Sequence, residues 1–310
     1  MPITRSSNGA VRANTAPRIA LVGYGEVGQT LGADLATAGF AHLGVWDKRF
    51  TDPRSPPTRA AAARGVHNTI GLASALAGRS FVISAVTAAE CLAAAREAAA
   101  VIAPQAFYFD LNSVSPRTKR EAAALIEAAG ARYVEAAVMA PIAPQRSASP
   151  ILIGGPHAAE FAPLARSIGF RGVKIFATEI GRASAAKMCR SVLIKGLEAL
   201  LGESLLAARR CGVESTVLES LQDLLPNENW ERLGRYMIMR SLVHGVRRAE
   251  EMREAAQTVA DAGIEPLMSR ACAERQTWAA QHRPAGDPES LPGLLDAVLG
   301  SVPTDPLECA

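Results

Sequence analysis

The stretch "RIALVGYGEVGQTLGADLATAGF", residues 18–40, decides the expected fold. The apolar run 19–22 is typical of a buried strand, and a helical pattern of apolar residues follows it. Between the two, Gly23, Gly25 and Gly28 form G-x-G-x-x-G, a pattern that binds dinucleotides when it joins a strand to a helix. The same glycines could serve only a tight turn. The dinucleotide interpretation therefore needs a second strand that ends in an acidic residue about 20 positions later.

Asp47 supplies that acidic residue. It closes the apolar segment 42–47 and lies 19 residues after Gly28. A carboxylate at this place accepts hydrogen bonds from ribose hydroxyls and repels a 2′-phosphate, which favours NAD. Lys48 and Arg49 follow directly and are either solvated or able to hold a 2′-phosphate, so NADP stays possible. The residues expected to contact the cofactor here are Gly23, Tyr24, Gly25, Glu26, Val27, Gly28, Asp47, Lys48 and Arg49.

Up to residue 178, short apolar segments alternate with alanine-rich helical segments. Strands that alternate with helices of this kind form βαβ units and a parallel sheet. We therefore expect residues 18–178 to form an α/β Rossmann domain with a doubly wound, mostly parallel sheet that binds NAD or NADP. The later segments expected as strands are 81–86, 106–111, 132–138, 150–155 and 172–178.

The pattern changes at Glu179, where a stretch without internal proline predicts one long inter-domain helix of roughly 30 residues, against a mean of about 11–12. Further helical segments follow, among them 228–245 and 248–263 as two separate helices. The second domain is therefore expected to be all-α and to contribute to substrate binding and dimerisation. The expected divisions are a disordered tail 1–17, the domains 18–178 and 179–283, and a C-terminal tail 284–310.

The composition excludes several functional classes. The chain of 310 residues has a net charge of only +3 and no dense run of Lys and Arg, which argues against nucleic-acid binding. The five cysteines and five histidines are scattered without metal-binding spacing, so no metal site is expected. No apolar run is long enough to cross a membrane, and the polar N-terminus lacks the features of a signal peptide. We expect a cytoplasmic protein with reduced cysteines.

The segment "GRASAAKMCRS" at the start of the long helix contains the candidate acid/base, Lys187. Arg190 and Ser191 lie three and four residues later and so share its helix face. Burial beside a guanidinium would lower the pKa of Lys187 and let it exchange a proton with a substrate hydroxyl. The competing interpretation is an ordinary solvated lysine, which we expect for Lys195, two turns further on.

With this helix in view, four blocks together resemble the β-hydroxyacid dehydrogenases, the family of 6-phosphogluconate and 3-hydroxyisobutyrate dehydrogenases. The blocks are "GYGEVG" (23–28), "DLNSVSP" (110–116), "VEAAVMAPI" (134–142) and "GRASAAK" (181–187). The details are similar to a phosphogluconate dehydrogenase-like branch. The resemblance implies that Lys187 is the general acid/base and that Ser113 lies near the substrate carboxylate and the nicotinamide. It also implies that Ala85, Val86, Thr87 and Asn112 contact the cofactor.

Two blocks depart from the family pattern at the expected substrate site. Met139, Ala140 and Pro141 replace the usual S-G-G, and Arg190 and Ser191 replace two asparagines. An arginine can clamp an acid through two hydrogen bonds, whereas a methionine adds an adaptable apolar wall. We therefore expect Met139, Ala140, Arg190 and Ser191 to bind a small molecule that has an anionic end and an apolar body.

Three functions fit these observations. The leading one is NAD(P)-dependent oxidation of a 3-hydroxyacid-like alcohol, or its reverse, with Lys187 as acid/base. An imine reductase of similar fold is the second, although such enzymes generally lack the lysine; a non-catalytic NAD sensor or scaffold is the third. We also expect a homodimer formed by the helical parts, because Met237, Ile238, Leu242 and Val243 offer apolar faces.

Overall fold

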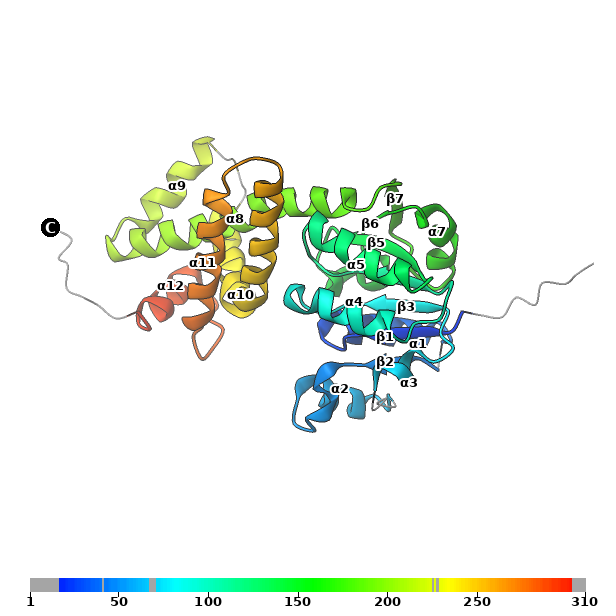
Figure 1. Ribbon diagram of the computed structural model, residues 1–310. Coiled ribbons are helices and arrows are strands. Elements are labelled where there is room, and N and C mark those ends of the chain that lie inside the picture. Colours follow the sequence, from blue (N-terminus) through cyan, green and yellow to red (C-terminus); the bar gives the residue numbers. More distant parts are fainter. Residues whose placement is uncertain (1–16, 41, 67–70, 225, 227–228, 303–310) are drawn as a thin grey trace, which may run out of the picture.

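The computed structural model describes residues 17–40, 42–66, 71–224, 226 and 229–302. An α/β region and a helical region lie side by side, and helix α8 (Arg182–Arg210) runs from one into the other (Figure 1). The expected tail at 1–17 lies, except for Pro17, outside the described residues.

Seven strands form the sheet of the described α/β region, in the order β2-β1-β3-β4-β5-β6-β7. All neighbouring pairs are parallel except β5 and β6. The chain goes from β1 outward to β2 and then returns to β3 on the other side of β1. In doubly wound sheets, ligands bind at the carboxyl ends of the strands beside such a reversal. The strands are β1 (Ile19–Val22), β2 (Gly44–Trp46), β3 (Phe81–Ser84), β4 (Phe107–Asp110), β5 (Arg132–Val138), β6 (Ile151–Gly154) and β7 (Val173–Ala177).

Helices cover both faces of the sheet, which explains why its central strands read as continuous apolar runs. On one face, Phe161 packs among Phe81, Phe107 and Phe109. On the other face, Tyr108 stacks on Tyr133. The first face is covered by α1 (Glu26–Thr37), α2 (Pro56–Ala63), α6 (Ile142–Gln145) and α7 (Ala158–Ser167), the second by α3 (Leu72–Leu76), α4 (Cys91–Ala99) and α5 (Pro116–Ala128).

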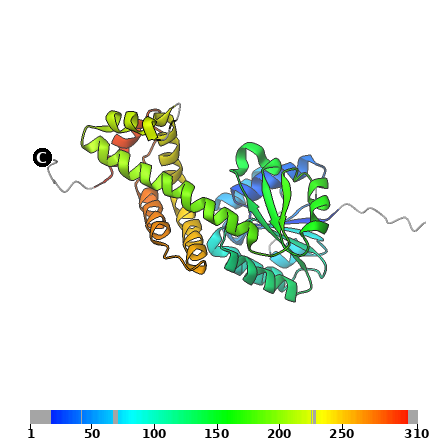
Figure 2. The same cartoon turned by 90° about the horizontal axis from the view of Figure 1, so that it is seen from above.

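The second region consists of helices, as the sequence predicts. Helix α8 is 29 residues long, close to the expected length, and packs along α10 (Trp230–Asp261) and α11 (Leu267–Gln281) (Figure 2). Helices α9 (Glu214–Leu224) and α12 (Leu291–Leu299) pack on the far part of α8. Among the described helices, no segment combines the length and hydropathy that a membrane span requires.

Helix α10 corrects one expectation, because its 32 residues form a single helix and not two. The sequence suggested a break at Gly245. In the structure this glycine lies where α11 crosses α10, and a Cβ atom there would lie 2.3 Å from the backbone oxygen of Gln276. The glycine therefore permits close packing of two helices and does not end one.

Residues 291–299, within the expected C-terminal tail, form helix α12, which packs against the helical region. Leu291, Leu294, Leu295 and Val298 are buried against α8, α10 and α11. Their i, i+3, i+4, i+7 spacing gives one apolar face. Pro292 lies in the first turn, where a proline is tolerated because its missing N–H would be unpaired anyway. Residues 303–310 lie outside the described residues.

Two residues expected on a dimer surface are also placed differently. Ile238 and Leu242 are each 3% exposed and belong to the core between α8, α10 and α12 of the same chain. Val243 is 38% exposed, and Met237 lines the cleft described below. Different faces of α10 therefore face the core of the same chain, the cleft and the surface.

A pair of glycine substitutions tests the packing of α10 on α11. Gly245→Ala is expected to lower the free energy of unfolding by about 1–3 kcal/mol, because the new methyl group overlaps backbone. The matched control is Gly196→Ala in α8, where a Cβ atom meets nothing within 4 Å. It is expected to raise the free energy of unfolding by about 0.5–1 kcal/mol through helix propensity. Chemical denaturation measures both, and equal effects would contradict the packing role.

Candidate active site

The three loop glycines each meet a different steric demand. Gly23 has φ +93°, and a Cβ atom there would lie 2.4 Å from the carbonyl oxygen of Ala85. At Gly28 a Cβ atom would lie 2.1 Å from the carbonyl oxygen of Gly23, so α1 packs directly on the turn. At Gly25 it would meet nothing within 4 Å. The loop is thus closed against the protein at two glycines and open outward at the third, which fits the approach of a pyrophosphate to the backbone.

Helix α1 adds an electrostatic reason for anion binding at this loop. It starts at Glu26 with Gly25 as N-cap, and no side chain caps its first N–H groups. Free N–H groups and the positive end of the helix dipole favour an anion at such a terminus. The loop residues present therefore fit the diphosphate of a dinucleotide.

Asp47 lies beside this loop, as its spacing predicts. Its carboxylate accepts hydrogen bonds from the backbone N–H groups of Tyr24, at 2.8 Å, and Arg49, at 2.9 Å. The carboxylate thus ties the end of β2 to the glycine loop and retains lone pairs for other donors. Lys48 forms an ion pair with Glu90, and the Arg49 side chain is 53% exposed.

A cleft of about 400 Å³ lies between the carboxyl end of the sheet and helices α8 and α10. Most of the predicted site residues meet there, although they come from segments far apart in the sequence. The predicted residues that line the cleft are Glu26, Val27, Ala85, Val86, Thr87, Ser113, Met139, Ala140, Lys187, Arg190 and Ser191. Those that do not line it are Gly23, Tyr24, Gly25, Gly28, Asp47, Lys48, Arg49 and Asn112.

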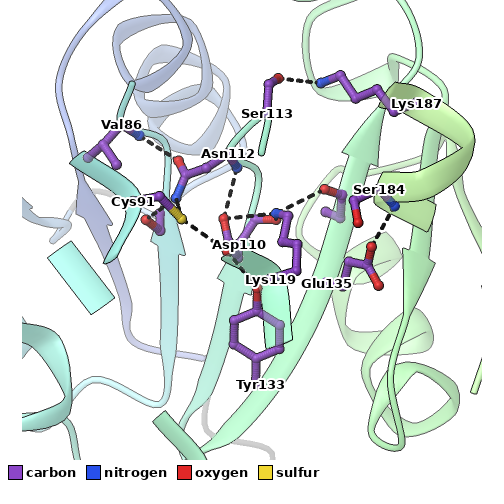
Figure 3. A network of polar contacts seen from close by, with 12 residues as sticks. Val86, Cys91, Asp110, Asn112, Ser113, Lys119, Tyr133, Glu135, Ser184 and Lys187 are labelled. Carbon is purple, nitrogen blue, oxygen red and sulfur yellow. Dashed lines mark hydrogen bonds and ion pairs between the residues drawn. The ribbon is translucent and has the colours of Figure 1, made fainter. Parts of the chain in front are cut away.

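Lys187 meets Ser113 in this cleft, where its Nζ donates a 2.5 Å hydrogen bond to the serine Oγ (Figure 3). The lysine is partly buried in the second turn of α8. Burial lowers the pKa of Lys187 from 10.5 to about 8, although the carboxylate of Glu251 acts in the opposite direction. An amine with a pKa near 8 can take up or release a proton close to neutral pH, as acid/base catalysis requires.

A buried carboxylate fixes the start of α8 and hence the place of Lys187. Glu135, in β5, accepts hydrogen bonds of 2.5 Å from the backbone N–H groups of Gly181 and Ser184. Figure 3 shows the bond from Ser184. Gly181 has φ +103°, which favours glycine at this turn. The negative charge at the positive end of the helix dipole adds to the two hydrogen bonds.

A second buried carboxylate, Asp110 at the end of β4, organises the segment before Ser113. It forms an ion pair with Lys119 at 3.0 Å, and it accepts hydrogen bonds from the Tyr133 hydroxyl and the Asn112 N–H (Figure 3). Both side chains of the ion pair are fully buried, so their hydrogen bonds offset a large desolvation cost. The network fixes the backbone on which Ser113 is carried.

Asn112 was expected to contact the cofactor, but the structure gives its side chain another role. Its Oδ1 accepts a 2.7 Å hydrogen bond from the Val86 N–H, and its Nδ2 donates to the Ser84 hydroxyl. The residue is 3% exposed. Asn112 therefore supports the cleft-lining segment after β3 from behind, and its contact with the cofactor stays a prediction.

Glu254 of α10 ties the Ser113 segment to the helical region. Its Oε2 accepts hydrogen bonds from the Ser115 N–H, at 2.6 Å, and from the Thr118 hydroxyl, at 2.9 Å. Ser115 is the N-cap of α5, so the carboxylate lies at the positive end of that helix. The Glu254 side chain therefore connects the segment that carries Ser113 to helix α10, which forms one wall of the cleft.

Sequence reasoning missed most of the residues that α10 contributes to the cleft. Arg240, His244, Arg247 and Glu251 follow one another at intervals of four, three and four residues, and all line the cleft. This spacing places them on one helix face. The signal was therefore present in the sequence, but charged helix faces are usually solvated, and nothing local shows that this one meets the sheet.

The charges of the cleft are only partly compensated. Glu198 pairs with Arg240 and Arg248, and Glu251 pairs with Lys195. Lys195 is 6% exposed, which corrects the expectation that it is solvated. Among the cleft-lining cations, Lys187, Arg190 and Arg247 have no salt-bridge partner within the described residues. Among the cleft-lining carboxylates, only Glu26 forms no salt bridge with a described residue. The excess of positive charge favours an anionic ligand.

The described part of the chain contains no cluster of His, Cys, Asp or Glu that could hold a metal ion. Cys91, Cys189 and Cys272 are free thiols.

Comparison with known proteins agrees with this geometry. Residues 18–170 match the NAD binding domain of 6-phosphogluconate dehydrogenase, and residues 208–279 match a domain of unknown function, DUF1932. A conserved hypothetical protein from Sinorhizobium meliloti is 35% identical, with a TM-score of 0.70 over 93% of this chain and 98% of its own. The conserved protein MTH1747, described as structurally similar to 3-hydroxyacid dehydrogenases, is 32% identical, with a TM-score of 0.63 over 92% of this chain and 100% of its own. The chain belongs to the β-hydroxyacid dehydrogenase family.

The same fold extends to more distant proteins. A 3-hydroxyisobutyrate dehydrogenase from Mycobacterium tuberculosis is 18% identical, with a TM-score of 0.67 over 91% of this chain and 99% of its own. Membership of the β-hydroxyacid dehydrogenases confirms the expected fold class and supports a nicotinamide-dependent oxidoreductase.

Substitutions in the glycine loop separate folding from cofactor binding. Gly25→Ala is expected to change the free energy of unfolding by less than about 1 kcal/mol, because a Cβ atom there meets no other atom. It should weaken NAD binding about tenfold or more, since the methyl group points into the space for the pyrophosphate. Gly28→Ala is expected to destabilise the fold by about 1–3 kcal/mol. Denaturation and calorimetric titration with NAD measure these effects; unchanged NAD affinity in Gly25→Ala would contradict the assignment.

Proposed function

We propose that this protein is an NAD(P)-dependent dehydrogenase that interconverts a 3-hydroxyacid-like alcohol and its carbonyl compound. The observation that carries the proposal is the contact between Lys187 and Ser113 in the cleft beside the glycine loop. An amine with a lowered pKa, a hydroxyl and the expected cofactor loop meet at one place. A protein that only sensed NAD would have no need to bury a lysine at this point.

The cofactor would be held mainly by main-chain groups. The loop around Gly25 and the start of α1 suit its diphosphate, and Asp47 suits the adenosine ribose. The carboxylate of Asp47 favours NAD over NADP, because a 2′-phosphate would be repelled there. Lys48 is already paired with Glu90, which reduces its ability to bind such a phosphate. When bound, the nicotinamide ring supplies or accepts the hydride.

Lys187 is assigned the proton transfer. As a neutral amine it takes the proton of the substrate hydroxyl when the alcohol is oxidised, and as an ammonium it returns that proton in reduction. Ser113 accepts a hydrogen bond from the amine and keeps its own proton available for a substrate oxygen. Glu135 holds the helix that carries the lysine, and Glu254 holds the segment that carries the serine. Both partners therefore require little reorganisation during the reaction.

The substrate is proposed to be anionic with an apolar body. Arg190 and Arg247 supply positive charge that no described carboxylate neutralises by a salt bridge. Leu111, Met139 and Met237 form an apolar part of the same lining. Ser191 is 7% exposed and adds a hydroxyl close to Lys187 on α8. An acid group would thus lie toward the arginines and an alkyl group toward the methionines.

A cofactor-reduction assay against a panel of hydroxyacids and amino alcohols, with NAD and with NADP, tests the substrate and cofactor assignments. Hydroxyacids with apolar bodies are expected to give a higher kcat/KM than 6-phosphogluconate, and NAD a higher value than NADP. Preference for 6-phosphogluconate would contradict the proposed apolar wall, and preference for NADP would contradict the role of Asp47.

Substitution of the lysine tests the catalytic assignment. Lys187→Met removes the acid/base and keeps a side chain of similar length, so turnover is expected to fall by about 10² or more. Binding of NAD, measured by calorimetric titration, is expected to change little because the glycine loop is untouched. Lys174→Met, on the exposed strand β7, is the matched control and should leave both quantities unchanged. Full turnover in Lys187→Met would refute the assignment and favour a sensor or scaffold.

We also propose that the protein is a homodimer in which the helical regions pack together. Leu193 and Leu200 of α8 are 64% and 54% exposed, and Tyr236 and Val246 of α10 are 52% and 66% exposed. Light scattering is expected to give twice the chain mass of 32.5 kDa. The double variant Leu193→Glu and Leu200→Glu should shift the mass toward the monomer. A monomeric mass for the unaltered chain would contradict the proposal.

A further inference from the structure

The ion pair between Lys195 and Glu251 lies on the boundary between α8 and α10, in the lining of the cleft. Its side chains are 8% and 15% exposed, so the pair is shielded from bulk water. Pairs with so little exposure interact much more strongly than surface pairs, and removal of one partner leaves an uncompensated charge. The carboxylate of this pair, Glu251, acts to raise the pKa of Lys187, His244 and Arg248, which line the same cleft.

Two lysines of α8, Lys187 and Lys195, act electrostatically on the Glu251 carboxylate. The charge of Lys187 is felt by Glu251, and the charge of Glu251 is the strongest single charge felt by Lys187. The carboxylate nevertheless forms its ion pair with Lys195 and accepts a hydrogen bond from the Lys195 Nζ, whereas the Lys187 Nζ donates to the Ser113 hydroxyl. Two amines thus compete for one carboxylate, and the structure shows which of them holds it.

We infer that Lys195 is a positioning residue that holds the Glu251 carboxylate away from the Lys187 amine, leaving that amine free to bind Ser113 and to exchange a proton. This inference rests on the proposed acid/base role of Lys187. If Glu251 paired with Lys187 directly, the ammonium would be stabilised and drawn away from the serine. Lys195 thereby protects the reactive lysine from the opposite charge that acts on it most strongly.

The other charged groups around Lys187 agree with this role. Lys119 from α5, Lys195 from α8 and Arg247 from α10 all disfavour its protonated form, and Glu251 is the group that favours it. Burial raises the pKa of Glu251, yet Lys195, Lys187 and Arg247 together bring it down to about 2. Glu251 therefore stays ionised throughout the pH range in which Lys187 titrates, and its effect depends on its position and not on its own protonation.

The inference predicts shifts of opposite sign for the two members of the pair. Lys195→Met removes a positive charge and releases Glu251 toward Lys187, so the midpoint of Lys187 titration should rise by about one pH unit or more. Glu251→Gln removes the negative charge, so the midpoint should fall by a similar amount. The double variant should return close to the midpoint of the unaltered protein.

The direct measurement is pulse labelling of the protein with acetic anhydride at a series of pH values. Mass spectrometry of the peptide that contains Lys187 gives the pH at which its amine becomes reactive, and no cofactor or substrate is needed. In the unaltered protein the midpoint is expected near pH 8. Where turnover is measurable, the rate of alcohol oxidation should rise through the same midpoint, because oxidation needs the neutral amine, and the rate of reduction should fall through it.

Conservative variants keep the test informative if a substitution disturbs the fold. Lys195→Arg retains the cation and is expected to keep the midpoint within about 0.3 pH unit. Lys174→Met is the control for the loss of a lysine elsewhere. Equal shifts in Lys195→Met and Glu251→Gln, or no shift in either, would overturn the inference. Opposite shifts combined with full turnover in Lys187→Met would uphold the positioning role and reject the proposed acid/base, so the two failures are distinguishable.

Discussion

The interaction on which the site depends most is the capping of α8 by the buried carboxylate of Glu135. Two backbone N–H groups at the start of the helix donate to it from a turn that contains Gly181. The carboxylate belongs to the longest strand of the sheet, in the middle of the fully buried layer. The sheet thereby sets both the origin and the direction of a 29-residue helix. Every residue that α8 presents to the cleft inherits its position from that one contact.

The helical region contributes through charge as well as through shape. Helices α8 and α10 exchange two sets of ion pairs across their boundary, Glu198 with Arg240 and Arg248, and Lys195 with Glu251. These pairs occupy the cleft-lining carboxylates of both helices and leave Arg190 and Arg247 as an excess of positive charge in the cleft. The α/β region supplies the expected cofactor loop, whereas the helices supply most of the charge available to a second ligand.

The sequence was sufficient where a local pattern determines the structure. The glycine loop, the strand positions, Asp47 and the length of α8 follow from short-range periodicity and spacing, and the fold class is confirmed. It was insufficient where a residue is defined by a partner far along the chain. The prediction of a helix end at Gly245 is wrong because its neighbour in α11 lies more than 30 residues away. The prediction of a solvated Lys195 is wrong because its partner Glu251 lies 56 residues away. The contacts of the Asn112 side chain with Ser84 and Val86 could not be predicted either, because these partners lie 28 and 26 residues earlier in the chain.

The reversal of β6 against β5 has a consequence for how the chain can vary. Because β6 and β7 run opposite to the other strands, the chain returns to the level of Glu135 before α8 begins, and only one turn of helix separates Ser184 from Lys187. A residue inserted into that turn would rotate everything after it by about 100° and carry the lysine off the cleft. An insertion after Arg210, where α8 has ended, would leave the cleft unchanged. The length of the chain is therefore constrained most tightly over the few residues that follow the cap.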